Sequence, residues 1–518
     1  MKKARVNNSE EQDAEDARQN LAKLICYERL APRSFCNSTF KIFHGMDSSN
    51  PRLSCLKFDT LESNCLEIYK AERQKVKETF SKHGGKISLS VDLLAHEKQW
   101  NRYLCISAHF IDNDWKLQKW VIKYSCFFNG IILKSLKEYD IESKMLSLTV
   151  GGTCALDDMV KEVQEDVEVP QLFHMQCISD IITRMIQSGL EEISKIIDKV
   201  RGLSWSRSEP LWYLTTFKLS EALKLEEMGE FATVEDNGWY EVPSKEEWEK
   251  VRSMCRIADR IYGITKGLFE IKKPTPNHFL PHCQEIRAHL LKESTSSDEF
   301  VRLVAQKMLD IFNKYLDDMH LVLSITAFLD PRFKMKFIEF CPSDWRLTTY
   351  LESIRKVYDG YVDNVVTRDQ KEYPFSDSSS KEEEETEEWS ETEAKVKRCD
   401  ILENLGFVKE YCQSMMQSEH DMARKCDLDL YVEEPILPWT GNFSVLHWWN
   451  DNDVTYPRLS RMARDFLAIP MSVATSYDAY YTEPRVADCT LYSLKPVLAN
   501  ALKCTRSWKF GATASKVN

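Results

Sequence analysis

The sequence predicts an α/β domain with a mixed sheet, followed by a large all-helical region and a mixed C-terminal region. Three observations predict this order. Residues 86–127 hold three segments with strand character, the first of which strictly alternates apolar and polar side chains. Helical and strand patterns then alternate along residues 131–200, as they do in α/β proteins. From about residue 212 to residue 364 the apolar spacing is almost wholly helical.

The first three strands are expected to form an antiparallel meander. Ile87, Leu89 and Val91 fall on one face of the alternating segment 86–92. Strands at 103–111 and 117–127 follow, and the residues Asp-Asn-Asp between them favour a tight turn. The other elements predicted for this domain are helices at 131–139, 157–167 and 178–200 and strands at 145–150 and 172–177.

Helices are predicted before and after this sheet-forming part of the sequence. The pattern is helical from about residue 20 to residue 81, and again at 400–418 and 456–469. In the all-helical region, Ser244 and Glu247 have the spacing of a capping box, in which each side chain bonds the backbone of the other. A helix is therefore expected to begin just after Ser244.

Composition marks a boundary between the helical and C-terminal regions. Between Ser376 and Glu393 nine acidic side chains accompany one lysine, so we expect a solvated, flexible linker, to which Trp389 gives a slight likeness to an activation segment. The expected segments are a disordered tail at 1–17, helices at 18–85, the first part of the sheet domain at 86–205, a helical insertion at 206–365, the acidic linker at 366–398 and the C-terminal region at 399–518.

Composition also excludes some classes of protein. Of the 518 residues 43% are hydrophobic and 11% aromatic, which excludes global disorder. The sequence has no apolar run long enough to span a membrane and no secretory signal, so we expect a soluble, intracellular protein without a membrane partner. The 16 cysteines are scattered without Cys-x-x-Cys pairs, which favours reduced thiols over a zinc site. Outside the acidic linker the net charge of −12 largely disappears, so charge argues neither for nor against nucleic acid.

Four motifs in order resemble the hAT transposase superfamily, in particular the plant zinc finger BED domain-containing proteins of the RICESLEEPER and DAYSLEEPER kind. They are Ile87–Leu93 with Tyr103–Gln118, Pro243–Trp248, Phe328–Met335, and Trp448-Trp449 with Tyr456–Pro470. The resemblance covers roughly residues 20–510. The resemblance implies an RNase H-like mixed-sheet core, interrupted by a large helical insertion and completed by a C-terminal hAT dimerisation region.

The resemblance also implies a test of activity. Such transposases cut DNA with two divalent metal ions held by an Asp-Asp-Glu triad. Two Mg²⁺ ions about 3.5–4 Å apart repel each other by about 17 kcal/mol at an effective dielectric constant of about 20. Several carboxylates must offset that repulsion, and one carboxylate is not enough.

Two of the three triad positions lack a carboxylate in this sequence. Asp92 matches the first position. The second falls after the strand 145–150, where the family has Leu-Asp-Asn-Ala and this chain has Gly151. The third falls after the Leu-Ala-Ile-Pro motif, where the family has Ser-Glu-Ser-Ala-Phe and this chain has Tyr477. We therefore expect no enzyme activity, no catalytic or metal-binding residue and no cofactor, with Asp92 as a structural remnant.

Neighbouring acids are the alternative source of metal ligands. Asp157 and Asp158 lie six and seven residues beyond Gly151, on the next predicted helix. Asp478 is adjacent to Tyr477, but one residue of a helix turns by about 100° and points the side chain elsewhere. Substitution by these groups is the less favoured interpretation.

Other family positions also differ. The family's Cys-x-x-His after the fifth strand is Cys177-Ile-Ser-Asp180 here, without the histidine. Trp212 matches a tryptophan that contacts unpaired DNA in active enzymes, but its arginine neighbour is missing, so core packing and base stacking both stay open for it. No counterpart of the BED finger is expected before Asp92.

The C-terminal helix 456–469 has an apolar stripe and a basic face. The stripe recurs at i, i+3, i+4, i+7 and i+8 and comprises Leu459, Met462, Ala463, Phe466 and Leu467. It either packs on the chain's own core or, with Trp448 and Trp449, contacts a second subunit, as the resemblance implies. The basic face consists of Arg458, Arg461 and Arg464, which either are solvated or contact DNA phosphate.

These observations favour a domesticated or degenerate transposase-like protein that is catalytically inactive. We expect it to form a homodimer or higher homo-oligomer, to bind DNA weakly or without sequence specificity, to reside in the nucleus and to act as a transcriptional regulator. The alternatives are an interaction scaffold or decayed element product that does not bind DNA, and a nuclease that is still active.

Overall fold

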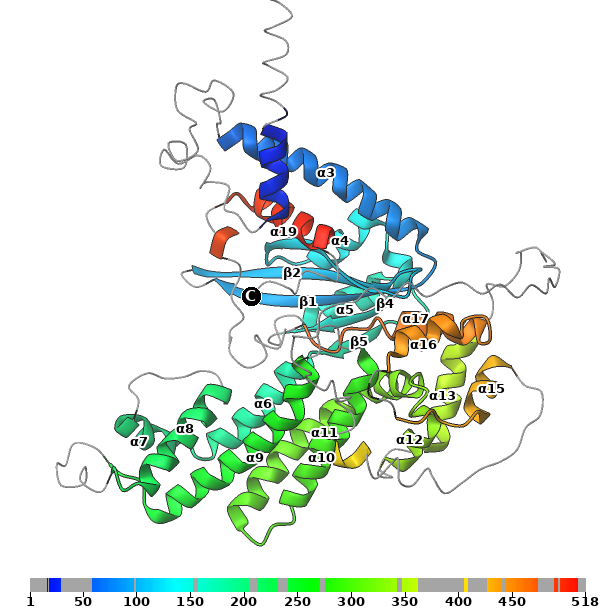
Figure 1. Cartoon of the computed structure of the whole chain (residues 1–518). Helices are drawn as coiled ribbons and strands as arrows, with labels where there is room; N and C mark the ends of the chain where they lie inside the picture. Colours follow the sequence, from blue (N-terminus) through cyan, green and yellow to red (C-terminus); the bar gives the residue numbers. More distant parts are fainter. Residues whose placement is uncertain are drawn as a thin grey trace, which may run out of the picture.

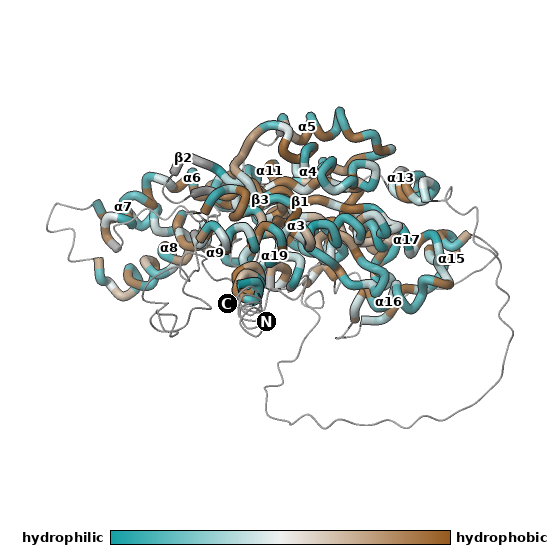
Figure 2. Tube along the Cα trace, turned by 90° about the horizontal axis from the view of Figure 1, so that it is seen from above, coloured by the Kyte–Doolittle hydropathy of each residue, from teal (hydrophilic) through white to brown (hydrophobic). Residues whose placement is uncertain are grey.

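The structure is a computed structural model that places an α/β layer above a helical layer (Figure 1). It describes residues 16, 18–28, 58–96, 99–151, 157–204, 212–231, 241–270, 275–341, 347–361, 405–408, 426–439, 441, 443–473, 489–491 and 494–510. Hydrophobic residues concentrate in the strands and on the inner sides of the helices, and hydrophilic residues face outward (Figure 2). Within the described residues no helix is both long and apolar enough to span a membrane.

A mixed sheet of five strands forms the centre of the α/β layer. Its strands are β1 (Ile87–His96), β2 (Gln99–Ile111), β3 (Leu117–Cys126), β4 (Met145–Val150) and β5 (Phe173–Gln176), in the spatial order β3-β2-β1-β4-β5. β1, β2 and β3 pair antiparallel, whereas β4 runs parallel to both β1 and β5. The predicted meander and the predicted mixed sheet are both confirmed.

Four helices pack together against this sheet. Apolar side chains of β1 and β2 pack with α3 (Phe58–Lys82), α4 (Ile131–Tyr139) and α5 (Asp157–Asp166) in one core. The last helix, α19 (Pro496–Phe510), packs along β3 and α3, and the Trp508 ring stacks on Tyr69 at 5.6 Å. The C-terminal helix α19 thus packs on the same sheet as the strands near the start of the described chain.

The helical layer follows β5 in the chain. Its helices are α6 (Ile178–Glu191), α7 (Ser194–Ser204), α8 (Trp212–Glu227), α9 (Lys245–Glu270), η5 (Pro276–His278), α10 (Phe279–Glu293), α11 (Glu299–Phe328), α12 (Lys334–Phe340) and α13 (Leu347–Asp359). The helix expected at 178–200 is two helices, because the chain turns at residues 192–193. The capping box is confirmed, since Glu247 N donates to Ser244 Oγ at 3.2 Å and Ser244 N to Glu247 Oε2 at 2.8 Å.

The C-terminal region joins the two layers. It comprises a short anchor at 405–408 and the helices α15 (Asp427–Glu433), α16 (Val445–Asp451), α17 (Pro457–Phe466), η7 (Cys489–Leu491) and α19. A single hydrophobic core runs from α6 and α11 of the helical layer through α15, α16 and α17 to β5, where Phe173 meets Phe466 at a ring distance of 5.4 Å. The acidic linker and most of the helix expected at 400–418 lie outside the described residues.

Candidate functional site

The sheet brings the first two triad positions together. Asp92 lies in β1, and Val91 before it pairs with Val150, the last residue of the parallel strand β4. Gly151 follows directly and its backbone N donates to Val91 O at 2.9 Å, so Gly151 lies beside Asp92. The two positions are therefore adjacent, but Gly151 has no side chain with which to bind a metal.

Of the acidic residues that could replace the missing metal ligands, the structure describes some and not others. The Asp158 side chain in the first turn of α5 is 98% exposed and lies 4.0 Å from Lys161 Nζ. Tyr477 and Asp478 lie outside the described residues. Among the described residues, no three His, Cys, Asp or Glu side chains come together in a group that could hold a metal ion.

The chain segment that leads to the third position lies against the ends of β4 and β5. Thr149 Oγ1 donates to Pro470 O at 2.5 Å, and Ile178 N donates to Met471 O at 3.0 Å. Val473 N donates to Cys177 Sγ at 3.4 Å. The residues just after α17 therefore extend the site, as expected if the C-terminal region completes the RNase H-like core.

The cysteine of the altered Cys-x-x-His motif packs within this extension. Cys177 Sγ lies 3.0 Å from Ser179 Oγ and 3.4 Å from Ser472 Oγ. Asp180, which stands in place of the histidine, lies in the first turn of α6, where an acidic side chain suits the positive end of the helix dipole. The motif thus joins α6 to the segment after α17.

Trp212 begins α8 and packs in the core. Its side chain is 3% exposed, and its ring lies edge-on to Tyr213, which in turn stacks on Tyr262 of α9 at 4.5 Å. In this arrangement a nucleotide base does not reach its face. The burial supports the packing alternative for Trp212 over base stacking.

The apolar stripe of α17 also packs on the chain itself. The stripe side chains that the sequence suggests for a subunit interface are all fully buried: Leu459, Met462, Phe466 and Leu467. Trp449 is equally buried and its Nε1 donates to Leu329 O at 2.8 Å, whereas Trp448 is half-buried. Burial against the helical layer therefore favours the own-core alternative over a surface at which folded copies meet.

The basic face of α17 is half-buried and partly used within the chain. Arg461 Nη2 donates to Tyr361 O at 2.9 Å. The guanidinium of Arg464 lies 4.6 Å from the centre of the Trp115 ring, in the turn between β2 and β3. Each guanidinium carries five N–H donors, so these contacts leave donors for a phosphate. The assignment of the arginines to DNA stays a prediction.

Two charged centres escaped the sequence predictions. The first is Asp330, whose carboxylate accepts bonds from Arg332 Nε at 3.0 Å and Nη2 at 2.7 Å, and from Asn277 Nδ2 at 2.7 Å. Burial opposes ionisation of Asp330, but Arg332 outweighs it and lowers the carboxyl pKa. Both charged residues of this centre lie in the motif 328–335. Two opposite charges within a largely apolar segment could have predicted a buried ion pair.

The second centre is Asp465, on the polar side of the buried stripe. Its carboxylate accepts a bond from Lys86 N at 2.8 Å, just before β1, and one from Tyr361 Oη at 3.0 Å, just after α13. Burial raises the pKa of Asp465 to about 6. A Cβ atom at Gly85 would lie 2.6 Å from Asp465 Oδ1, so glycine there permits the approach. Asp465 thus holds the sheet, the helical layer and α17 together.

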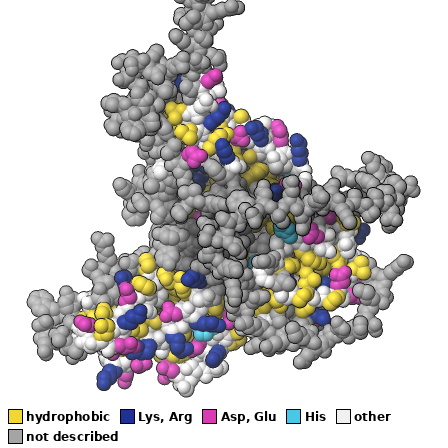
Figure 3. All heavy atoms as spheres, in the orientation of Figure 1, with side chains coloured by type: hydrophobic (Ala, Val, Ile, Leu, Met, Phe, Trp, Pro, Cys, Tyr) yellow, Lys and Arg dark blue, Asp and Glu magenta, His cyan; other side chains and the backbone are white. Residues whose placement is uncertain are grey.

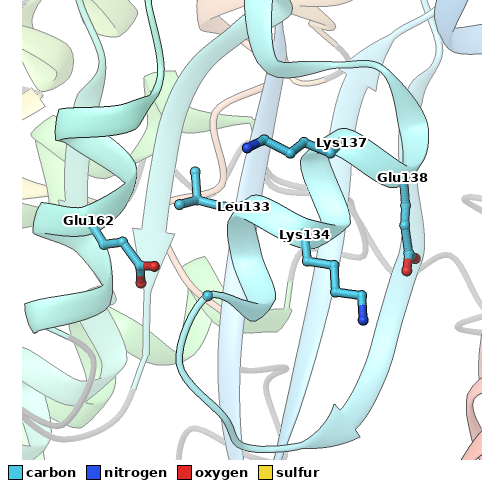
Figure 4. A pocket seen from close by; sticks show the side chains of 6 residues that line it. Leu133, Lys134, Lys137, Glu138 and Glu162 are labelled. Carbon is cyan, nitrogen blue, oxygen red and sulfur yellow. The ribbon is translucent and has the colours of Figure 1, made fainter.

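A shallow hollow between α4 and α5 offers little to a ligand. Gly130, Leu133 and the charged side chains of Lys134, Lys137, Glu138 and Glu162 line it (Figure 4). It is wide open to solvent and ringed by charges of both signs, whereas small-molecule sites are typically enclosed clefts.

Comparison with known proteins agrees with this architecture. Three family models match consecutive parts of the chain: the ZBED1 RNase-like domain at residues 94–177, the hAT-like transposase RNase-H fold at 277–367, and the hAT family C-terminal dimerisation region at 427–509.

Curated relatives cover most of the chain. The zinc finger BED domain-containing protein RICESLEEPER 2 of Oryza sativa subsp. japonica is 26% identical over 94% of this chain and 73% of its own length. The corresponding values for DAYSLEEPER of Arabidopsis thaliana are 25%, 96% and 74%. The putative AC transposase of Zea mays is 26% identical over 87% of this chain and 60% of its own length. In its RNase-H fold and its C-terminal dimerisation region, the chain is thus similar to hAT transposase-like proteins.

Proposed function

We propose that this chain is a catalytically inactive, transposase-like protein that self-associates through its C-terminal region and binds DNA in the nucleus as a regulator. One observation carries the proposal of inactivity. Gly151 lies beside Asp92 at the end of β4, where a second carboxylate would have to hold a metal ion between the two strands.

The electrostatic argument for inactivity is quantitative. At the site, Asp92 supplies one negative charge against the four positive charges of two Mg²⁺ ions. Their mutual repulsion of about 17 kcal/mol at an effective dielectric constant of about 20 then has little to offset it. Glycine at position 151 adds no ligand, and tyrosine at position 477 supplies no carboxylate. Two-metal cleavage of DNA requires ligands that these positions do not supply.

A nicking assay tests inactivity directly. The purified full chain is incubated with supercoiled plasmid and Mg²⁺ or Mn²⁺, and we expect no conversion to open circles above the buffer control. Asp92→Asn serves as the matched control, because it removes the remaining carboxylate. Metal-dependent nicking by the wild type that Asp92→Asn abolishes would show that the site is active.

The arginines of α17 support DNA binding. Arg458 and Arg464 are half-buried residues on the polar side of α17, and their charge is suited to the phosphate backbone. The sequence outside the acidic linker is close to neutral, so a local patch of this kind is needed to attract DNA.

A gel-shift titration with random duplex tests this role. We expect Arg458→Gln/Arg464→Gln to weaken binding uniformly across sequences and to reduce the slope of log K against log salt by about 0.9 per lost phosphate contact. Lys224→Gln/Lys245→Gln, on exposed positions of α8 and α9, is the control with the same change in charge. Equal slopes for the two variants would refute the assignment.

An interaction scaffold without DNA contact is the second candidate. It is favoured by the bonds that Arg461 and Arg464 already make within the chain. In that case the wild type shows no salt-dependent shift at all, while light scattering still detects self-association. Fluorescence microscopy of a tagged full chain tests the nuclear location for both candidates.

A further inference from the structure

The region that matches the dimerisation family model buries its apolar face inside its own chain. Leu459, Met462 and Phe466 are each fully buried against the helical layer. A second folded copy therefore does not find this apolar face at the surface. An extensive contact that could join two copies is the one that already joins the C-terminal region to the helical layer.

That contact is centred on residues 328–334, which we call the clasp. Three hydrogen bonds join its backbone carbonyls to the C-terminal region: Tyr431 Oη to Phe328 O at 2.9 Å, Trp449 Nε1 to Leu329 O at 2.8 Å, and Leu437 N to Pro331 O at 3.0 Å. All three donors come from residues 431–449. The clasp thus presents carbonyl groups that the C-terminal region satisfies.

Both cations of the clasp also face the C-terminal region. The guanidinium of Arg332 lies 4.5 Å from the centre of the Trp439 ring and 4.3 Å from that of Phe443. Lys334 Nζ donates to Tyr431 O at 2.7 Å, in the last turn of α15, and to Glu434 O at 3.0 Å, at the residue that follows the helix. A cation there satisfies carbonyls that lack helical partners and suits the negative end of the helix dipole.

Without the C-terminal region, the conformation of the clasp would be unfavourable in free energy. Lys334 is only 3% exposed at its side chain and adopts a positive φ of 50°, a conformation that surrounding contacts must hold in place. Without residues 431–449, buried carbonyls and aromatic rings would meet water. In Figure 3 hydrophobic side chains gather around α13, α15 and α16, where the two regions meet. The clasp therefore requires a C-terminal region, but the contacts do not require it to belong to the same chain.

The connections that precede α15 are long enough for an exchange between copies. Residues 362–404 separate the end of the helical layer from the anchor, and residues 409–425 separate the anchor from α15. An extended chain covers about 3.3–3.6 Å per residue, so the first connection alone can reach well beyond 100 Å. Tyr431 contacts Trp449 and Tyr456 at ring distances of 5.4 and 5.6 Å, so α15, α16 and the start of α17 would move as one unit.

We propose that two copies self-associate by exchanging residues 427–473, so that the clasp of each copy holds the C-terminal region of the other. The inference rests on the self-association proposed above. It specifies the partner as a second copy of this chain and the contact as the clasp. Exchange of identical elements is a low-cost route to dimers because both states make the same contacts.

A charge reversal distinguishes exchange from docking within one chain. Arg355 Nη2 of α13 donates to Asp429 Oδ1 of α15 at 2.5 Å, and the two side chains are 42% and 24% exposed. Chains with Arg355→Glu and chains with Asp429→Arg each place like charges together when they dock alone. An exchanged mixed dimer instead has one reversed pair and one native pair, both attractive.

The experiment uses the two full-length variants with different tags, unfolded together in urea and refolded. We expect a severalfold excess of mixed dimers over the random ratio of 1:2:1, and the random ratio for wild-type chains with the same tags. The double variant Arg355→Glu/Asp429→Arg, in which the pair is restored within one chain, is the control for folding.

The outcomes separate this inference from the proposed function. A random ratio for the variant mixture, with dimers present, overturns the exchange and leaves self-association intact. A wild-type protein that is monomeric in light scattering overturns self-association itself, and the exchange with it. An excess of mixed dimers that 1 M salt reduces toward the random ratio supports the exchange, because salt screens charges at this exposed pair.

Discussion

The end of β4 and the clasp differ in whether their charged side chains have partners of opposite charge. At the end of β4, Asp92 lies beside a glycine, and the described residues around it form no group that could hold a metal ion. In the clasp, Asp330 and Arg332 are both buried, and two side-chain hydrogen bonds of 3.0 and 2.7 Å join them. Both lie within a fold shared with transposases.

The difference indicates which parts of the fold depend on charge. Carboxylates clustered at a metal site repel one another when no metal ion is bound. Such a cluster is therefore retained only while the protein needs the metal. A buried ion pair is retained for another reason, since removal of either partner leaves an uncompensated charge in the core. In this chain the charged pair that holds the clasp together is present, and we propose that the carboxylates needed for cleavage are replaced at positions 151 and 477.

The largest effect is expected at the clasp. Asp330→Ala leaves the Arg332 guanidinium buried without its carboxylate, and we expect a loss of about 3–5 kcal/mol in the free energy of unfolding. Urea denaturation of the full chain measures it. Asp359→Ala, at an exposed acid near the end of α13, is the control and is expected to change stability by about 0.5 kcal/mol or less. Equal losses of unfolding free energy for both variants would show that the buried pair in the clasp does not stabilise the fold.

A smaller, pH-dependent effect is expected at Asp465. The pKa of about 6 in the folded protein lies above the ordinary value of 3.8, so the folded state binds this proton more tightly than the unfolded state does. Its contribution to stability is full below the ordinary value and is lost as pH rises through about 6. Between about pH 5 and about pH 7.5 the wild type should lose about 1.4 kcal/mol relative to Asp465→Asn.

The measurement is the difference in unfolding free energy between wild type and Asp465→Asn at several pH values. Asp359→Asn gives the background, since its side chain belongs to an exposed residue. A difference that stays constant with pH would show that Asp465 is ionised to the same degree in both states. Asp465 would then resemble an ordinary surface carboxylate.

The smallest effect is expected at the capping box of α9. Ser244→Ala removes the acceptor of the Glu247 N–H bond, and we expect a loss of about 1 kcal/mol. Thermal unfolding of the full chain detects it, with the exposed Lys245→Ala as the neighbouring control. This variant calibrates the other two, because it removes a hydrogen bond without affecting a buried charge. A loss as large as that of Asp330→Ala would argue that the clasp pair has no special role.

Local patterns were sufficient to predict most of the fold. The helix at 131–139 and the strand at 145–150 match to the residue, because both have an unmistakable period and clear turn residues at their ends. The helix expected at 178–200 is broken at residues 192–193, where the apolar spacing continues on both sides and gives no signal of the turn. The adjacency of Asp92 and Gly151 was not predicted, since no local pattern in the sequence brings β1 and β4 together.

The use of the apolar stripe could not be predicted in the same way. Leu459, Met462 and Phe466 define an amphipathic helix, but the same spacing serves a core and an interface equally well. Only the position of α11 and the clasp shows that the stripe is buried within the chain. The clasp contacts connect residues about a hundred positions apart, as between Lys334 and Tyr431, and spacing along the sequence carries no information about such pairs.

Metal binding is the most direct test of the central claim. Isothermal titration of the full chain with Mn²⁺ is expected to show no stoichiometric uptake, and Gly151→Asp/Tyr477→Glu, which restores both carboxylates, is expected to bind Mn²⁺ more tightly than the wild type. Tight binding of two Mn²⁺ ions per wild-type chain, lost on Asp92→Asn, would contradict the claim that the site lacks the ligands for catalysis.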